Sequence, residues 1–422
     1  MTPTLPALAV LAALIFTEAL SALARWLNVR SLSLELPAPL RGIWSEEAYA
    51  RSQRYLAAST RLGLAREGFS LACLLAFLSC GGVCWLDGAA RAAFPGEVGA
   101  GLAFLGALAL AQALLDLPFA AWSAFVVEAR FGFNTTTART FVLDRLKGLG
   151  LAVILGGALL AAVLWAFQTL GGMAWLAAWA VVTAFSGVLL VVAPTWILPL
   201  FNRFEPLPQG DTRQALEDYA RDEGFALDGV FVMDGSKRST KANAFFTGVG
   251  KRKRISLYDT LLDKMTPEQL VAVLAHEIGH SRLGHIRTGF WLGTLRTGLT
   301  LGLAQLFLGW GGLQEAFGAT RPSIHVGLML FALAWQPLAL GLGALSNAVS
   351  RRFERQADAF AARAPGGPQA LAEALKALSL ANLSNLTPHP LLVALEYSHP
   401  PVLERLRLLA AHGPGPRPSG AA

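Results

Sequence analysis

Seven long apolar runs constrain the fold of this chain more than any other feature. Each run approaches the roughly twenty residues that a helix needs to cross the hydrocarbon core of a bilayer. The composition points the same way, because the chain is 54% hydrophobic and only 15% charged, whereas soluble domains carry about 25% charged residues. The chain is therefore predicted to be a mainly α, multi-pass membrane protein. The expected spans cover residues 5–23, 69–86, 98–125, 149–167, 173–198, 290–310 and 324–349.

The first run could also be a signal peptide. No basic residue precedes it, and it is longer than the apolar part of such a peptide, so we interpret it as a retained span. The links between runs alternate between rich and poor in Lys and Arg, and the net charge of +7 is spread over the rich ones. The positive-inside rule then predicts an outside N-terminus and cytoplasmic positions for the long connection 201–287 and the C-terminal region. Because the basic residues form no single patch, we expect no nucleic-acid partner.

A His-Glu-x-x-His motif at His276, Glu277 and His280 carries the clearest chemical signal. A helix start precedes it, with Thr266 as a hydroxyl cap, a proline at the first helical position, and Gln269 placed to complete a capping box. Side chains four residues apart share a face of a helix, so the two imidazoles can converge on one ion. Glu277 lies beside them, where it can reach a water without binding the ion. This pattern is typical of zinc metalloproteases, although a chance match within a buried helix would look the same.

A catalytic zinc site needs a third protein ligand and a water. Glu354 is our candidate, with Asp358 one helical turn later to accept the free N–H of a ligating imidazole. The alternative is an exposed helix with charges at i,i+4 spacing. His285 would lie on the opposite side of a continuous helix from His276, and we interpret it as a supporting residue.

Further motifs resemble the integral-membrane zinc proteases of the CaaX prenyl protease type, which are gluzincin-like metallopeptidases. The resemblance covers nearly the whole chain and follows one order along it. The matching stretches are Arg130-Phe-Gly-Phe-Asn134, Pro199-Leu-Phe-Asn202, Asp234-Gly-Ser-Lys-Arg-Ser239, Asn243-Ala-Phe-Phe, His276-Glu-Ile-Gly-His280, Phe353-Glu-Arg-Gln-Ala-Asp358 and Tyr397-Ser-His-Pro-Pro401.

This resemblance implies one Zn²⁺ per chain, held by His276, His280 and Glu354, with Glu277 as the catalytic base. It also implies seven helices around a water-filled chamber. His399 is our candidate for the donor that stabilises the oxyanion, and Arg405 matches a family position near the site. The expected substrate-binding residues lie on an edge strand that adds a strand of substrate backbone; they are Asn243, Ala244 and Phe245.

The expected organisation has five parts. Five transmembrane helices and their loops occupy 1–200, and a cytoplasmic segment with a short β-sheet and the zinc-binding helix occupies 201–288. Helices six and seven follow at 289–350, the C-terminal helical part of the catalytic unit at 351–412, and a flexible tail at 413–422. Within the second part we expect a helix at 214–224 and strands at 230–233, 244–247 and 254–258.

The predicted function is a zinc metalloendopeptidase that cleaves prenylated CaaX-type or other membrane-associated peptides at the surface of a lipid bilayer. The composition also suggests a bacterial inner-membrane protein, and a bacterial membrane quality-control protease is then an alternative. A transporter or receptor with a structural zinc is an alternative of another class. Such a site would be closed by four protein ligands and would have no use for Glu277.

Overall fold

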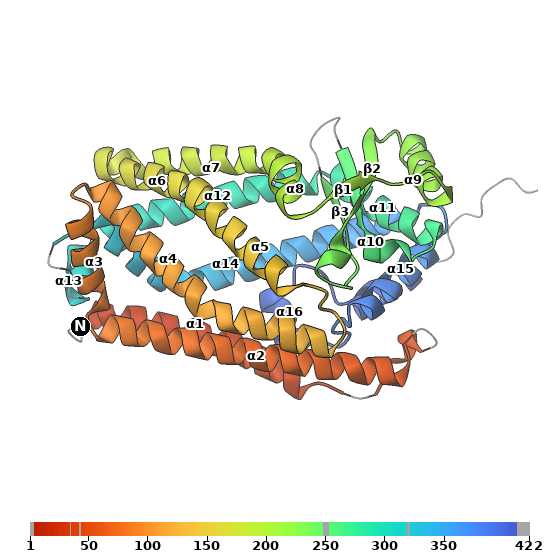
Figure 1. Ribbon diagram of the computed structural model, residues 1–422, viewed down its shortest axis with the longest axis horizontal. Coiled ribbons are helices and arrows are strands. Elements are labelled where there is room, and N and C mark those ends of the chain that lie inside the picture. Colours follow the sequence, from red (N-terminus) through yellow and green to blue (C-terminus); the bar gives the residue numbers. More distant parts are fainter. Residues whose placement is uncertain are drawn as a thin grey trace, which may run out of the picture.

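The computed structural model describes residues 4–33, 35–41, 44–247, 253–317, 319 and 321–411. The tail expected at 413–422 lies outside these residues. Long helices lie side by side along the length of the molecule, and a compact unit with a small sheet lies at one end (right in Figure 1).

The long helices confirm a mainly α, multi-pass membrane protein. Six of them, within the described residues, are long and apolar enough to cross a bilayer. π-type turns extend or join several of them: α4 continues to Glu128, α5 runs into α6, and α7 runs into α8. The helices of this part are α1 (Leu5–Arg30), α2 (Glu46–Ser79), α3 (Gly82–Ala93), α4 (Glu97–Trp122), α5 (Ala138–Leu151), α6 (Gly157–Thr169), α7 (Ala174–Val192), α8 (Leu198–Phe201), α12 (His285–Leu308), α13 (Gly311–Ala316) and α14 (Ile324–Ala361).

Two expected spans differ from the structure. The run 69–86 is not one helix, because Gly81 adopts a left-handed conformation (φ +75°) that ends α2 and starts α3. The actual span begins at Glu46, capped by the Ser45 hydroxyl, in a stretch whose many arginines hid it from a search for apolar runs. The run 290–310 does form α12, but polar residues such as Arg296 keep it outside the six most apolar helices.

The compact unit contains a four-stranded sheet in the order β1-β2-β4-β3. β2 and β4 are parallel, and the other pairs are antiparallel. The three expected strands and the expected helix are confirmed, whereas β1 is too short to predict. The elements of this unit are β1 (Phe204–Pro206), α9 (Asp211–Asp222), β2 (Leu227–Met233), β3 (Ala244–Thr247), β4 (Lys253–Tyr258), α10 (Asp259–Leu262), α11 (Pro267–Arg282), α15 (Gly367–Ala381), α16 (Pro390–Glu396) and α17 (Val402–Ala411).

The hydrophobic core of the compact unit lies between the sheet and α11. Ile255 and Leu257 of β4 and Leu270 and Leu274 of α11 are all fully buried there. Burying side chains of this size contributes about 1.5–3 kcal/mol each. The core therefore fixes α11, and with it the His-Glu-x-x-His motif, against the sheet.

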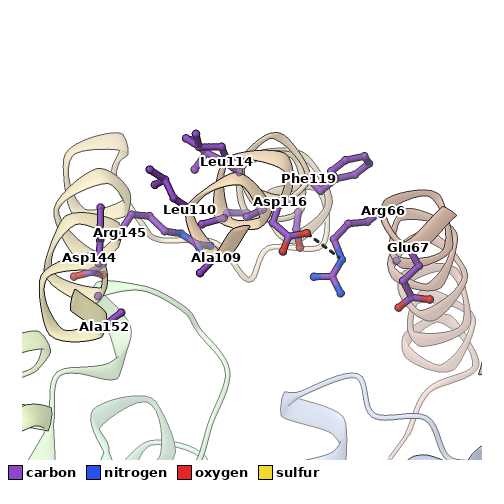
Figure 2. Close-up of a pocket in the computed structure, with 18 of the residues that line it drawn as sticks. Arg66, Glu67, Ala109, Leu110, Leu114, Asp116, Phe119, Asp144, Arg145 and Ala152 are labelled. Carbon is purple, nitrogen blue, oxygen red and sulfur yellow. Dashed lines mark ion pairs between the residues drawn. The ribbon is translucent and has the colours of Figure 1, made fainter. Parts of the chain in front are cut away.

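Some of the helices border a cavity of about 2300 Å³. Its lining comes mainly from α2, α4, α5 and α6, and it extends to Tyr397 in the compact unit. Figure 2 shows Arg66 of α2 reaching Asp116 of α4 across 3.8 Å, with Arg145 of α5 pointing toward α4. Ionisable groups inside membrane helices are costly against lipid, and these side chains line the cavity.

Candidate metal centre

The start of α11 is built as its sequence indicates. The Thr266 hydroxyl accepts a hydrogen bond from the Gln269 N–H at 3.3 Å, and the Gln269 side chain accepts one from the Thr266 N–H at 3.0 Å. With Pro267 in the first turn, this capping box satisfies N–H groups that a helix start leaves unpaired. The helix therefore begins at a defined residue, which sets the direction in which His276 and His280 project.

α14 packs unusually close to α11 because the motif contains Gly279. A Cβ atom at this position would lie 3.1 Å from Cβ of Phe360 and 3.3 Å from Cα of Ala357. Both contacts are tighter than ordinary packing allows, and one is to the backbone of α14. The glycine thus lets α14 bring Glu354 and Asp358 within reach of the histidines.

The structure brings His276, His280 and Glu354 together. The two imidazole Nε2 atoms are 3.1 Å apart. Oε2 of Glu354 lies 3.3 Å from Nε2 of His276, and Oε1 lies 3.2 Å from Nε2 of His280. Among the described residues, this is the only group of three or more His, Cys, Asp or Glu side chains whose ligand atoms converge in this way.

The surroundings of these three residues fit a cation. Oε2 of Glu354 is buried and has no hydrogen-bond partner among the described residues. Burial lowers the pKa of His276, but the carboxylates of Asp358 and Glu354 beside its ring outweigh burial and raise the pKa to about 9. The pocket therefore favours positive charge at this position. Two imidazoles and one carboxylate are a donor set that Zn²⁺ accepts in catalytic sites.

Asp358 and Arg405 support the His276 side of the group. Oδ1 of Asp358 lies 2.9 Å from Nδ1 of His276. The Arg405 guanidinium donates to both oxygens of Asp358, from Nε at 2.8 Å and from Nη2 at 2.6 Å. Burial lowers the pKa of Arg405, but the hydrogen bonds to Asp358 prevail and raise it. Asp358 thus remains a carboxylate that can orient the imidazole and fix its tautomer.

The side chain of Glu277, in the middle of α11, makes no hydrogen bond or ion pair with any of the described residues. Its pKa is raised above the usual range, chiefly by burial, while His276 and His280 oppose the rise. A carboxylate with a raised pKa and free oxygens is suited to take a proton from a water near neutral pH.

His285 differs from the expectation in position. α11 does not continue through it, since Gly284 turns left-handed (φ +71°) and α12 starts at His285. The turn brings Nδ1 of His285 to 3.0 Å from Nδ1 of His280, while Nε2 of His285 contacts Oε1 of Gln356 at 3.0 Å. His285 therefore contacts the ring of His280 on the side away from Glu354, and Gly284 is the sequence signal for this break.

His399 reaches the site from the segment between α16 and α17. Its Nε2 lies 3.3 Å from Oε1 of Glu354, and its Nδ1 lies 2.9 Å from the Ser398 hydroxyl. The side chain is 63% exposed. The ring is thus accessible to a substrate while both of its nitrogens contact polar groups.

The expected substrate strand is β3, which begins at Ala244. β3 pairs with β4 alone in the described sheet, with Ala244 opposite Leu257 and Phe245 opposite Ser256. Asn243 is exposed just before the strand, and its carbonyl accepts a hydrogen bond from Tyr258. The free edge of β3 is available to another extended chain.

Comparisons with known proteins agree with this arrangement. The family model for the CAAX prenyl protease N-terminal region, with five membrane helices, matches residues 25–203, and that for peptidase family M48 matches residues 206–412. A CAAX prenyl protease 1 homolog from Arabidopsis thaliana is 36% identical over 396 residues, which is 91% of this chain and 93% of that protein. The chain belongs to the CAAX prenyl protease family.

Two further comparisons extend over the same length. CAAX prenyl protease 1 from Saccharomyces cerevisiae is 33% identical over 406 residues, covering 89% of this chain and 88% of that protein. The crystal structure of Ste24p from S. mikatae has a TM-score of 0.91 and 32% identity, and it covers 96% of this chain and 100% of that one.

Family membership makes this chain a multi-pass membrane metalloendopeptidase. A transporter or receptor is not supported by any of these matches. The named relatives are eukaryotic, so the expectation of a bacterial inner membrane and a bacterial quality-control role has no support.

Proposed function

We propose that this protein is a zinc-dependent endopeptidase that hydrolyses peptide bonds of prenylated CaaX-type peptides, or of other membrane-associated peptides. The observation that carries the proposal is the convergence of His276, His280 and Glu354 beside an unpaired Glu277. The names of the relatives, CAAX prenyl proteases, support the substrate class.

In this proposal His276, His280 and Glu354 hold one zinc ion. Zinc, when bound, polarises the scissile carbonyl and lowers the pKa of water toward neutrality. Glu277 removes the proton from the attacking water and later delivers it to the leaving amine. Asp358 accepts from Nδ1–H of His276, and this leaves Nε2 of that ring as the ligand atom.

His399 donates a hydrogen bond to the developing oxyanion. When the Ser398 hydroxyl donates to Nδ1 of His399, the ring proton resides on Nε2. Nε2 is the atom that faces Glu354 and the reacting centre. One such donor contributes roughly 10²–10³-fold in kcat in other acyl-transfer sites.

The peptide backbone pairs with the edge of β3 through Asn243, Ala244 and Phe245. The cavity, which extends to Tyr397, accepts the remainder of the substrate. We also propose that the active site faces the cytoplasm, because the basic links 201–287 and the region from 351 carry it. The five-part division given by the sequence is retained as the working description of the chain.

The test is cleavage of a farnesylated CaaX peptide by the purified full-length protein, with the same peptide lacking the farnesyl group as a matched substrate. We expect preferential cleavage of the farnesylated peptide. Glu277→Gln should lower kcat by roughly 10²–10⁴-fold while the zinc content stays at that of the wild type. Cleavage that survives this substitution contradicts the role of Glu277, and equal cleavage of both peptides favours membrane-associated peptides in general.

A further inference from the structure

One face of α14 carries a continuous stripe of polar side chains. Its members are Asn347, Arg351, Glu354 and Asp358, at successive steps of four, three and four residues. These steps keep all four side chains on one side of a helix. Glu354 and Asp358 belong to the candidate metal centre described above. Asn347 and Arg351 lie two turns and one turn before Glu354, and among the described residues their side chains form no hydrogen bond or ion pair with that centre.

The first half of the stripe holds the end of α16. The Asn347 side chain donates to the carbonyl of Leu395 at 2.8 Å. Nη1 of Arg351 donates to two carbonyls, that of Val393 at 3.0 Å and that of Tyr397 at 2.6 Å. Carbonyls in the last turn of a helix lack part or all of their partners within the helix, and that of Val393 accepts from Arg351 in addition to the Tyr397 N–H at 3.3 Å. These side chains therefore cap α16 and fix the chain two residues before His399.

The second half of the stripe holds the chain beyond the same point. Glu354 contacts His399 itself, and Asp358 binds Arg405 of α17 through both oxygens. Pro400 and Pro401 lie between the two attachments and restrict the backbone. The segment 397–405 is thus attached to α14 on both sides of His399.

Arg351 uses its guanidinium to hold the end of α16. It is half-buried, and within the described residues no ion pair joins its guanidinium to a carboxylate; its hydrogen bonds go to the backbone carbonyls of Val393 and Tyr397. A smaller apolar residue there would leave the carbonyls of Val393 and Tyr397 without this donor. The turn before His399 could then shift, and displacements of about 1 Å near a reacting centre can cost roughly 10²-fold in rate.

We propose that Arg351 is a positioning residue that sets the place of the His399 ring over the metal centre, so that one face of α14 supplies the metal-binding carboxylate and aligns the oxyanion donor. This inference rests on the proposed role of His399 as that donor. Arg351 then affects turnover by positioning His399, and it does not affect metal binding.

A double-mutant cycle in the full-length protein tests the proposal. The variants are Arg351→Met, His399→Ala and both together, with Arg352→Met as a matched control, because Arg352 is the adjacent cation and is exposed. We expect Arg351→Met to lower kcat by roughly 10- to 100-fold, with KM and zinc content unchanged. Arg351→Lys should recover part of the loss, since an ammonium group can still donate to both carbonyls. Arg352→Met should keep the wild-type kcat.

The decisive result is non-additivity. Once His399 is replaced by Ala, adding Arg351→Met should lower kcat by no more than about twofold further. An equal loss in both backgrounds, or no loss in the single variant, overturns the proposal. If Arg351→Met does not fold, Arg351→Gln, which keeps one donor group, replaces it in the double-mutant cycle. Its kcat is then compared in the wild-type and His399→Ala backgrounds, and an equal loss in both, or no loss, again overturns the proposal.

The cycle also separates this inference from the proposed function. If His399→Ala alone leaves kcat unchanged, the role of His399 in the proposed mechanism is wrong. If His399→Ala lowers kcat as expected but Arg351→Met does not, the mechanism stands and only the inference about Arg351 fails.

Discussion

The molecule contains, near its two ends, two trios of one arginine, one aspartate and one histidine, in each of which the aspartate and the histidine are buried. At the metal centre, Arg405 binds Asp358, which lies 2.9 Å from His276. At the opposite end, near α3 and α13 (left in Figure 1), Arg91 binds Asp87 at 3.0 Å. Nε2 of His325 lies 2.6 Å from the same Asp87 oxygen.

The two trios differ in the groups that contact the part of the imidazole ring facing away from the aspartate. The second nitrogen of His276 faces His280 and Glu354, whose ligand atoms converge with it. The ring of His325 instead packs against Phe104, with ring centroids 5.0 Å apart, and Arg91 extends to Glu97 and Ser323. The arginine–aspartate–histidine trio is therefore a structural unit in both places. A second histidine and a carboxylate distinguish the trio at His276, which we propose binds a metal ion.

The largest expected contrast comes from removing each histidine. His276→Ala should eliminate zinc binding and lower activity by roughly 10³-fold or more, because a Lewis acid is worth several kcal/mol in the transition state. His325→Ala should leave zinc content and kcat near wild type but lower stability by about 1.5–3 kcal/mol, the typical contribution of a hydrogen bond to a charged group, because Asp87 keeps Arg91 as its partner. Metal analysis, peptide cleavage and thermal unfolding measure the three quantities. Zinc loss in the His325 variant would contradict the comparison.

A smaller contrast is expected for the two aspartates. Asp358→Asn keeps the shape of the side chain but weakens its contact with Nδ1 of His276, and it should reduce zinc affinity or activity by about 10–100-fold. Asp87→Asn should change only the unfolding temperature. Zinc titration of the metal-free protein, compared with thermal unfolding, distinguishes the two effects. Equal zinc affinities in both variants would show that Asp358 does not tune the metal ligand.

The smallest effect is expected at Ser398. Ser398→Ala removes one hydrogen bond to Nδ1 of His399. A hydrogen bond of this kind contributes about 1 kcal/mol, which corresponds to a loss of about fivefold in kcat, with KM and zinc content unchanged. Steady-state kinetics on the farnesylated peptide measures it. A change in KM alone would mean that Ser398 contacts substrate and does not orient His399.

Local signals made much of the fold predictable. The capping box of Thr266 and Gln269 and the turn residues around the strands act over a few positions, so the sequence shows them directly. The second membrane helix was misplaced because α2 begins in an arginine-rich stretch and ends at the left-handed Gly81. An apolar run alone does not show where such a helix starts.

The metal centre was predictable only in part for a related reason. The spacing of His276 and His280 is a property of one helix, whereas the distance from Glu354 to both depends on the close packing that Gly279 permits. His285 was misplaced because Gly284 ends the helix that we had extended through it. The contacts of Arg351 with Val393 and Tyr397 join residues more than forty positions apart, and no local pattern indicates them.

The central claim is that His276, His280 and Glu354 hold one zinc ion. A crystal structure of the full-length protein, with anomalous diffraction recorded at the zinc absorption edge, tests it most directly. We predict one anomalous peak at about 2.0–2.2 Å from the two Nε2 atoms and a Glu354 oxygen. A peak held by other residues, or no peak at this position in fully active protein, would contradict the account.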